Sequence, residues 1–280
     1  MQPVVLLSDF GTSDGYAAVM RGVILSYNPS LAVHDATHQI RQFSIRSASY
    51  VLHTLLSEFP VDTVFVCVVD PGVGSDRREL IARIDGRIVV APDNGLITLA
   101  SLMAETREFH RAKPSILAEL RAAKRPYSQT FDGRDLFAPL GARIATLGLG
   151  PVVDATSDYV LDETLRPVPL PESSDDITQS GREVAAQIIH IDSFGNAITS
   201  LRREGASGEI PGTALCGGHA FPMHGSFSGT SRGDALSYWG SYGFLELAVR
   251  EGSAEADFGL EPGMTVTFTP LVDTPGSENL

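Results

Sequence analysis

Three short apolar runs constrain the fold of this chain more than any other feature of its sequence. They cover residues 4–7, 64–69 and 88–91, and none of them alternates apolar with polar residues. Such runs are typical of strands buried on both faces, which occur in parallel sheets covered by helices. Between the first two runs, residues 16–27 and 45–56 carry apolar residues at helical spacing. This order predicts an α/β fold with a mostly parallel sheet.

An aspartate follows each of these runs. Asp9 comes after the first, Asp70 after the second and Asp93 after the third. The carboxyl ends of parallel strands meet at one edge of the sheet, where ligands bind, so we expect the three side chains in one crevice. A single aspartate there is most often a helix cap or a turn former. Three together favour a site for a metal, a ribose diol, or an ammonium or sulfonium group.

The second part of the chain has a different character. It holds five of the 21 basic residues but 15 of the 34 acidic ones, and it begins after Pro167, Pro169 and Pro171. Its short apolar runs are separated by glycine-rich turns, at residues 185–191, 197–201, 243–249 and 264–268. We therefore expect an N-terminal α/β domain over 1–170, a linker over 171–181 and a smaller all-β domain over 182–280.

Composition excludes several classes of function. The 280 residues carry a formal net charge of −13 and only two lysines, which argues against binding nucleic acid or an anionic membrane surface. Cys67 and Cys216 cannot form a disulfide framework. The first residues do not resemble a signal peptide, and no apolar run reaches the ~18 residues of a membrane helix. We expect a soluble, cytoplasmic protein.

A metal site is one alternative at the predicted crevice. Asp9, Asp70, Asp93 and Asp135 offer oxygen ligands of the kind that Mg²⁺ prefers. His34 and His38 are four residues apart, but the segment follows a strand and lacks the HExxH pattern, so a capped turn is the favoured interpretation. We expect no metal, and a Mg²⁺-dependent hydrolase is the weakest of three functional hypotheses.

Two loops combine acidic residues with arginine. In the loop at 70–78, Arg77 follows Asp70 by seven residues, close enough to fold back and pair with it. A structural ion pair that braces the turn is an equally good interpretation of this segment alone. The second cluster lies at 130–135. Arg134 and Asp135 there are also consistent with an ion pair that stabilises the start of the helix expected over 136–147.

Taken together, seven motifs resemble one family over residues 4–268. They are SDFG at 8–11, DATH at 35–38, VDPGVG at 69–74, APDNG at 91–95, FDGRD at 131–135, FGN at 194–196 and GSYGFLE at 240–246. In this order they are similar to the S-adenosyl-L-methionine hydrolases (adenosine-forming), also known as hydroxide adenosyltransferases. These enzymes are relatives of fluorinase and chlorinase.

The resemblance implies an N-terminal α/β domain, a C-terminal barrel-like β domain and a homotrimer. Active sites would lie between the N-terminal domain of one subunit and the C-terminal domain of the next. Water would attack C5′ of the ribose of S-adenosyl-L-methionine, releasing adenosine and L-methionine. The small-molecule substrate would need no cofactor and no metal.

The resemblance also implies roles for substrate-binding residues. Asp9 would bind the ribose hydroxyls, Asp14 and Asp192 the methionine ammonium, Ser241 its carboxylate, Asn196 the adenine, and Phe43 would pack on the nucleoside. These roles suit the residue types, because a carboxylate accepts two hydroxyl protons and favours a cationic ligand.

Within this resemblance, the residue at position 70 distinguishes the hydrolases from the halogenases. The halogenases have tyrosine where Asp70 stands, and a carboxylate there would repel halide, so water is the expected nucleophile. The family's hydrolases surround that water with an aspartate, an arginine and a histidine. Asp70 and Arg77 match the first two, with Arg78 as the alternative if the loop is shifted by one. The family's FHGRD reads FDGRD here, so Asp132 replaces the histidine.

We interpret Asp70 as the group that orients water and takes its proton, because arginine does not lose its own. Asp132 is expected to pair with Asp70 across Arg77, so that one apparent pKa of the pair rises. Two alternatives stay open. Asp132 can be a substitution in a slow or repurposed enzyme, or the protein can bind S-adenosyl-L-methionine or adenosine without turnover.

Overall fold

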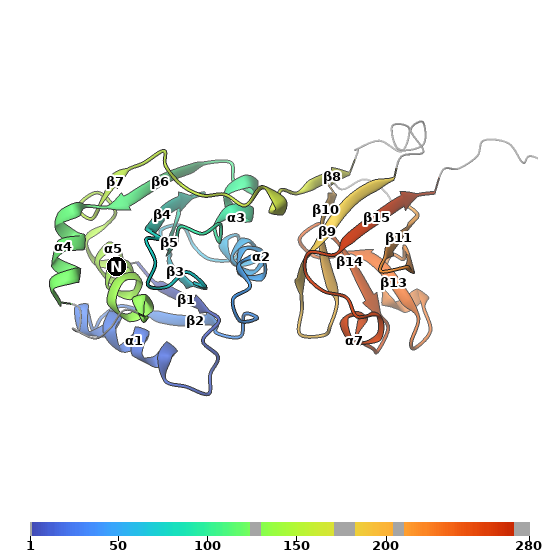
Figure 1. Ribbon diagram of the computed structural model, residues 1–280, viewed down its shortest axis with the longest axis horizontal. Coiled ribbons are helices and arrows are strands. Elements are labelled where there is room, and N and C mark those ends of the chain that lie inside the picture. Colours follow the sequence, from blue (N-terminus) through green and yellow to red (C-terminus); the bar gives the residue numbers. More distant parts are fainter. Residues whose placement is uncertain (1, 124–129, 171–182, 204–209, 272–280) are drawn as a thin grey trace, which may run out of the picture. The chain divides into compact units, whose positions relative to one another are not determined.

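A computed structural model describes residues 2–123, 130–170, 183–203 and 210–271 (Figure 1). It divides into two compact units, Met1–Thr164 and Leu165–Leu280, which are described separately below. The linker expected over 171–181 lies outside the described residues.

The N-terminal unit is built on a seven-stranded sheet in the order β2-β1-β3-β5-β4-β6-β7. The strands are β1 (Val4–Ser8), β2 (Val33–Thr37), β3 (Val64–Val68), β4 (Glu79–Ile84), β5 (Arg87–Pro92), β6 (Arg107–Ala112) and β7 (Val153–Ala155). The first four in this order are parallel, and β4, β6 and β7 join them antiparallel. The predicted α/β fold is confirmed. Its antiparallel half begins at the hairpin turn Asp85-Gly86, where both residues have positive φ.

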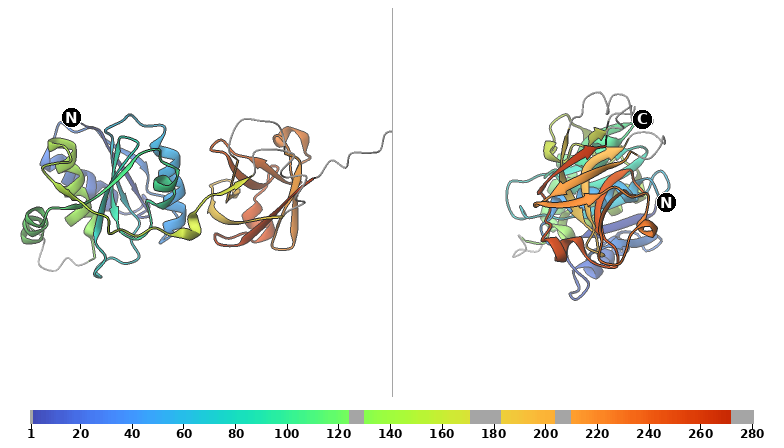
Figure 2. Two further views of the ribbon diagram at one scale, coloured as in Figure 1. Left: turned by 90° about the horizontal axis from the view of Figure 1, so that it is seen from above. Right: turned by 90° about the vertical axis from the view of Figure 1, so that its right-hand side faces the viewer.

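Helices cover both faces of this sheet (Figure 2). They are α1 (Tyr16–Tyr27), α2 (Ile45–Leu56), α3 (Thr98–Met103), α4 (Pro114–Ala123) and α5 (Ala138–Leu147), with a 3-10 turn at Glu163–Leu165. The helices predicted over 16–27 and 45–56 are confirmed. The helix expected over 136–147 instead begins as a π-helical turn, Gly133–Phe137, that runs into α5.

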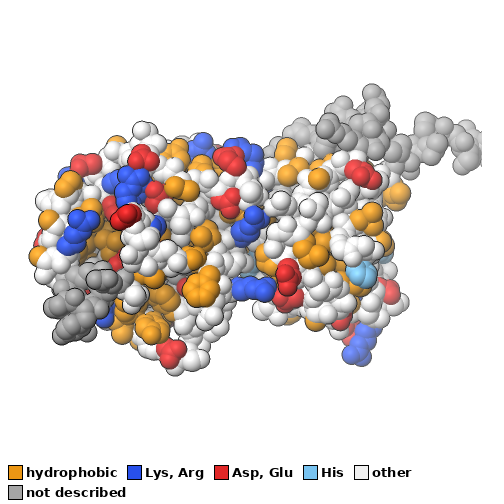
Figure 3. All heavy atoms as spheres, in the orientation of Figure 1, with side chains coloured by type: hydrophobic (Ala, Val, Ile, Leu, Met, Phe, Trp, Pro, Cys, Tyr) orange, Lys and Arg blue, Asp and Glu red, His pale blue; other side chains and the backbone are white. Residues whose placement is uncertain are grey.

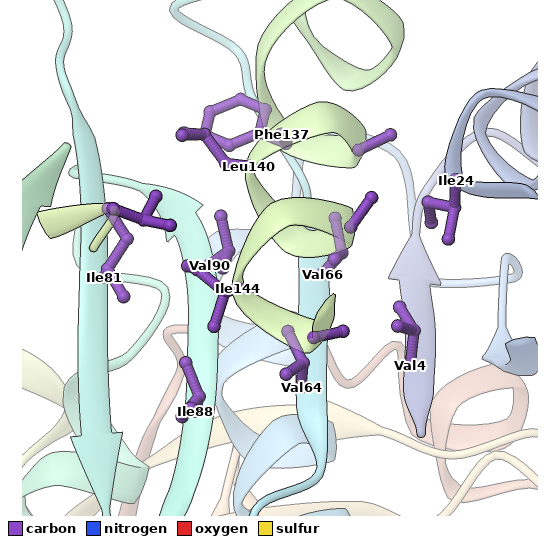
Figure 4. Packing of buried hydrophobic residues seen from close by; sticks show 14 of the residues in the cluster. Val4, Ile24, Val64, Val66, Ile81, Ile88, Val90, Phe137, Leu140 and Ile144 are labelled. Atoms are coloured by element: carbon purple, nitrogen blue, oxygen red, sulfur yellow. The ribbon is translucent and has the colours of Figure 1, made fainter. Parts of the chain in front are cut away.

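Two apolar clusters, one on each face, form the core of this unit. Figure 4 shows α5 and the π-helical turn packing on the strands, with Phe137, Leu140 and Ile144 facing Val66 and Val90. The other cluster joins α2 and α3 to the opposite face and contains Cys67. Burial raises the pKa of the Cys67 thiol, which keeps it protonated and unreactive.

The C-terminal unit is an all-β domain. Its strands are β8 (Val168–Leu170), β9 (Val184–Ile191), β10 (Ala197–Arg203), β11 (Gly212–Cys216), β12 (His219–Pro222), β13 (Ala235–Trp239), β14 (Phe244–Val249) and β15 (Thr265–Pro270). It also contains the short helix α7 (Ala254–Phe258) and a 3-10 turn, Phe227–Gly229.

These strands follow the order β12-β11-β15-β9-β10-β14-β13, and β8 pairs with β10. The pairing is antiparallel except between β8 and β10. An isolated bridge joins Met223, the residue after β12, to Ser237 of β13, so the sheet is nearly closed. The barrel-like fold predicted for this part of the chain is confirmed.

The surface of the N-terminal unit mixes charges of both signs. In Figure 3, Lys and Arg side chains lie beside Asp and Glu side chains on the visible face. Exposed pairs such as Arg78 with Asp158 and Arg83 with Asp62 contribute to this pattern. Within the described ranges, no helix is long and apolar enough to span a bilayer.

The close packing of α5 on β3 leaves no space for a side chain at Gly141, which a substitution can test. A Cβ atom there would overlap Val66 Cγ2. We expect Gly141→Ala to lower the free energy of unfolding by about 1–3 kcal/mol, because overpacking forces side chains out of their preferred rotamers. Urea denaturation followed by the helical circular dichroism signal measures the change.

Two variants control this experiment. Gly22 lies exposed in α1 with no atom near its would-be Cβ, so Gly22→Ala should stabilise the unit by about 1 kcal/mol. Adding Val66→Ala to Gly141→Ala should make the glycine substitution less costly than it is alone. Equal effects of Gly141→Ala in both backgrounds would contradict the packing argument.

Candidate active site

A cavity of about 260 Å³ opens beyond the carboxyl ends of β1 and β3. Its lining combines four acids with aromatic and small residues: Asp9, Phe10, Asp14, Tyr16, Gln42, Phe43, Val68, Asp70, Val73, Thr130, Phe131, Asp132 and Gly133. We call it the front cavity. The adjacent pairing of β1 with β3 brings Asp9 and Asp70 to the same edge of the sheet.

Arg77 lies between two of the four carboxylates of this cavity, those of Asp70 and Asp132. Its Nε donates to Asp70 Oδ1 at 3.2 Å, and its Nη2 contacts both Asp70 Oδ2 and Asp132 Oδ2, the latter at 2.9 Å. The side chains of Asp70, Arg77 and Asp132 are 5%, 8% and 17% exposed. The guanidinium also lies 5.0 Å from the centre of the Phe137 ring. The bridged arrangement expected from the sequence is present.

The loop after Asp70 folds back through its own hydrogen bonds. Ser75 Oγ donates to the Gly72 carbonyl at 2.6 Å and accepts from the Arg77 backbone N–H at 3.2 Å. This turn directs Arg77 back onto Asp70. Arg78 instead forms an exposed ion pair with Asp158 at 2.7 Å. Of the two arginines left open by the sequence, Arg77 is therefore the one beside the carboxylates.

Burial raises the pKa of the Asp70 carboxyl above its ordinary value. The charge and hydrogen bonds of Arg77 oppose this effect, and the negative charge of Asp132 adds to it. Asp70 therefore binds a proton more readily than an exposed aspartate does, a property suited to a general base.

Asp9 and Phe43 are joined by a backbone contact. Asp9 Oδ2 accepts a hydrogen bond from the Phe43 N–H at 2.8 Å, and Phe43 has a φ of 63°. Phe43 is 67% exposed and lines the cavity. Asp14 lies on the exposed loop before α1 and also lines the cavity.

The histidines suggested as metal ligands do not form a metal site. His38 is buried, with Nδ1 2.7 Å from Ser8 Oγ and Nε2 3.2 Å from Asp35 Oδ1. Its carbonyl accepts from the Gly11 N–H, which ties the Asp9 loop to β2. Among the described residues, no three His, Cys, Asp or Glu side chains are placed to hold a metal ion.

The prediction that Asp93 joins Asp9 and Asp70 in one crevice is wrong. Asp93 is buried, accepts from the Val160 N–H at 2.8 Å and forms an ion pair with Arg111 at 2.5 Å. Arg111 comes from β6, which is placed next to β4 by antiparallel pairing. The Asp93 carboxylate therefore stabilises the antiparallel half of the sheet.

In the C-terminal unit, the side chain of Asp192 organises the turn between β9 and β10. Oδ1 accepts from the N–H groups of Phe194 and Asn196, each at 2.9 Å, and Oδ2 accepts from Asn196 Nδ2 at 3.0 Å. Both Asp192 and Asn196 line a cavity of about 720 Å³. Ser241 is exposed on the turn between β13 and β14, and it is not among the residues that line this cavity.

Two groups of residues near these cavities were not predicted to belong to a site. Phe10, Tyr16 and Phe131 pack ring to ring in the front cavity, with centroids 5.2 to 5.8 Å apart. In the other unit, Tyr238 Oη donates to Glu246 at 2.5 Å, and burial raises the pKa of Glu246. Tyr16 is the first residue of the helix predicted over 16–27, and the spacing of apolar residues in that helix does not indicate that the Tyr16 ring lies at a cavity.

Comparison with known proteins identifies relatives of both units. The model of the SAM hydroxide adenosyltransferase N-terminal domain matches residues 4–150, and that of the C-terminal domain matches residues 186–267. A protein from Thermus thermophilus named (R)-S-adenosyl-L-methionine hydrolase is 38% identical, covering 95% of this chain and 99% of the relative. A fluorinase from an Actinoplanes species is 26% identical over 95% and 97% of the two chains.

Solved structures share the fold. A crystal structure of an uncharacterized conserved protein from Thermotoga maritima has a TM-score of 0.78 and 28% identity, covering 95% of this chain and 99% of that one. A conserved hypothetical protein from Thermus thermophilus has a TM-score of 0.73 and 35% identity, covering 97% and 100%.

The ion pairs of Arg77 with Asp70 and Asp132 predict that replacing Arg77 lowers the free energy of unfolding by an amount that depends on pH. Arg77→Gln leaves two largely buried carboxylates without their cation, and we expect a loss of about 3 kcal/mol in unfolding free energy near pH 8. Without Arg77 the folded-state pKa of Asp70 rises further above its unfolded value. The loss should therefore be small near pH 4 and grow as the pH rises.

Urea denaturation of the N-terminal unit at several pH values measures this dependence. Arg78→Gln is the matched control, because its ion pair with Asp158 is exposed and should contribute little. A destabilisation of Arg77→Gln that does not vary with pH would contradict the buried bridge.

Proposed function

The chain belongs to the SAM hydroxide adenosyltransferase family, and we propose that it hydrolyses S-adenosyl-L-methionine to adenosine and L-methionine. Relatives named (R)-S-adenosyl-L-methionine hydrolase support this function, and the alternative of binding without turnover is not favoured. The observation that carries the proposal is the Asp70 carboxylate in the front cavity, held by Arg77. A carboxylate repels halide and accepts a proton from water.

In this reaction a water oxygen attacks C5′ of the ribose in line with the sulfonium. The new O–C5′ bond forms as the C5′–S bond breaks, and the electron pair of that bond goes to sulfur, which leaves as a neutral thioether. Asp70 orients the water and takes its proton. Holding the two reactants in line supplies a large share of the rate gain, and the loss of charge at sulfur makes a dry cavity favourable.

Arg77 and Asp132 adjust the basicity of Asp70 in opposite directions. Arg77 keeps its proton, holds the carboxylate in place and stabilises negative charge that develops on the water. Asp132 shares the same Nη2 and raises the pKa of Asp70 by its negative charge. In our proposal, this second carboxylate takes the place of the family's histidine.

The acids of the front cavity suit a substrate that carries positive charge. We assign Asp9 to the ribose hydroxyls, Asp14 to the methionine ammonium and Phe43 to the nucleoside. In the C-terminal unit, Asp192 is assigned to the ammonium, Asn196 to the adenine and Ser241 to the methionine carboxylate. No cofactor or metal enters the reaction, and we place the enzyme in the cytoplasm.

A shared site would explain why these residues are divided between two units. We propose a homotrimer in which the front cavity of one subunit meets the C-terminal unit of the next. The cavities of both units carry exposed phenyl rings, Phe43 in the first and Phe194 in the second, which is 76% exposed. Aromatic residues of this kind are enriched at interfaces and binding surfaces.

Incubation of the purified protein with S-adenosyl-L-methionine tests the activity directly. We expect adenosine and methionine in equal amounts by chromatography, at a rate that a metal chelator does not change. Asp70→Asn should lower the rate at least ~100-fold, because the amide cannot take the proton of the attacking water. S-adenosyl-L-methionine that stays intact with the unaltered protein would refute the hydrolase assignment.

The pH profile tests the role of Asp132. With Asp70 as base, kcat/KM rises with pH through the pKa of Asp70. Asp132→Asn removes the charge that raises this pKa, so the acid limb should move to lower pH, with a lower kcat because the base is weaker. Asp132→His, which restores the family's residue, should remain active. An Asp132→Asn enzyme with unchanged rate and profile would exclude the pair.

Complementation tests the shared site. Asp70→Asn inactivates the front cavity and Asn196→Ala weakens the C-terminal half, so each variant alone should have little activity. If sites form between subunits, random co-assembly pairs two intact halves in about one quarter of the sites. Co-expression should then restore up to about a quarter of normal activity, with a trimer by light scattering. No recovery in a mixed trimer would place each site within one subunit.

A further inference from the structure

A second cavity lies behind the Arg77–Asp132 ion pair. Its volume is about 280 Å³, and Arg77, Asp132, Leu117 and Leu120 are among the residues that line it. We call it the rear cavity. Asp132 lines both the rear cavity and the front cavity, so one carboxylate side chain stands between the two spaces.

The rear cavity is lined by charges of both signs. Its lining holds four acids as well as three arginines. Arg77 is paired with Asp70 and Asp132, and Arg78 is paired with Asp158. Leucine side chains, among them Leu117 and Leu120, complete the lining beside these charged groups.

The mouth and the floor of this cavity differ in exposure. Ser75, Asp76 and Arg121 are exposed and form its solvent side, whereas Leu120 is buried. At the inner end, Arg77 is braced by the Phe137 ring and by Asp70. The cavity therefore extends from exposed residues to Asp132, which also lines the front cavity.

We propose that the rear cavity carries water in and protons out of the reaction centre, with Asp132 as the relay between the two cavities. The proposal rests on the hydrolase function. Each turnover consumes one water and releases one proton, while the substrate fills the front cavity and covers its opening. Asp70 is 5% exposed, and of the two cavities it lines only the front one. It therefore needs a second group to carry its proton to solvent.

The relay balances as a pair of proton transfers. Once Asp70 has taken the proton of the attacking water, its O–H bond breaks and an O–H bond forms on Asp132, directly or through one water. Asp132 then gives the proton to water in the rear cavity, from which it reaches solvent. Arg77 keeps its protons throughout and holds both carboxylates in place.

Chemical rescue tests this route at saturating substrate, when the front cavity is occupied. Asp132→Ala leaves a gap that formate can fill from the rear cavity, so formate should raise kcat at least ~3-fold. Adding Leu117→Trp narrows the rear cavity and should abolish most of this rescue. Adding Leu147→Trp, at an exposed site on the last turn of α5, should leave it intact.

The outcomes separate this inference from the proposed function. No rescue of Asp132→Ala, or equal rescue in all three variants, overturns the relay even when the unaltered enzyme is active. An unaltered protein that does not release adenosine refutes the hydrolase function instead. Circular dichroism and adenosine affinity must match across the three variants. Leu117→Phe, a smaller obstruction, replaces Leu117→Trp if the larger side chain disrupts folding, and it should reduce the rescue in part.

Discussion

One guanidinium between two buried carboxylates governs the chemistry of the N-terminal unit. Arg77 offsets only part of the negative charge of Asp70 and Asp132, so the cluster keeps an excess of negative charge in a poorly hydrated place. Burial raises the pKa of Asp70, and the negative charge of Asp132 adds to this effect. The excess of negative charge also complements a substrate with a sulfonium and an ammonium group. When sulfur leaves as a neutral thioether, this attraction weakens, which favours release of the products.

The fold holds this cluster in place from two directions. From the sheet, the parallel pair β1 and β3 delivers Asp9 and Asp70 to one edge. From the helices, α5 packs so closely on β3 that a Cβ atom at position 141 would overlap Val66, and the π-helical turn before α5 places Phe137 beside the Arg77 guanidinium. Gly133 contributes as well, because a side chain there would press on Met20, Phe131 and Phe10. Packing therefore fixes the position of Asp132.

Position 132 also determines how this enzyme differs from its relatives in our proposal. A histidine beside Asp70 would be a neutral or cationic partner, whereas an aspartate is an anionic one. The consequences are a stronger base at position 70, a greater dependence on Arg77, and a carboxylate with access to the cavity on either side. Substrate binding at the front and proton release at the rear then involve different surfaces of the same unit.

Features that depend on near neighbours along the chain could be predicted from the order of residues alone. Apolar spacing predicted the helices at 16–27 and 45–56, and a seven-residue loop with two glycines was enough to bring Arg77 back to Asp70. The turn residues Asp85-Gly86 connect β4 and β5 as a hairpin, and with it the sheet becomes antiparallel, a change that the apolar runs did not predict. The packed structure was needed to show that Asp93 pairs with Arg111, that Arg77 rather than Arg78 pairs with Asp70 and Asp132, and that Asp132 lines two cavities. The physical reason is that such contacts follow from the pairing of strands and the packing of helices far apart in the chain, which residue spacing does not encode.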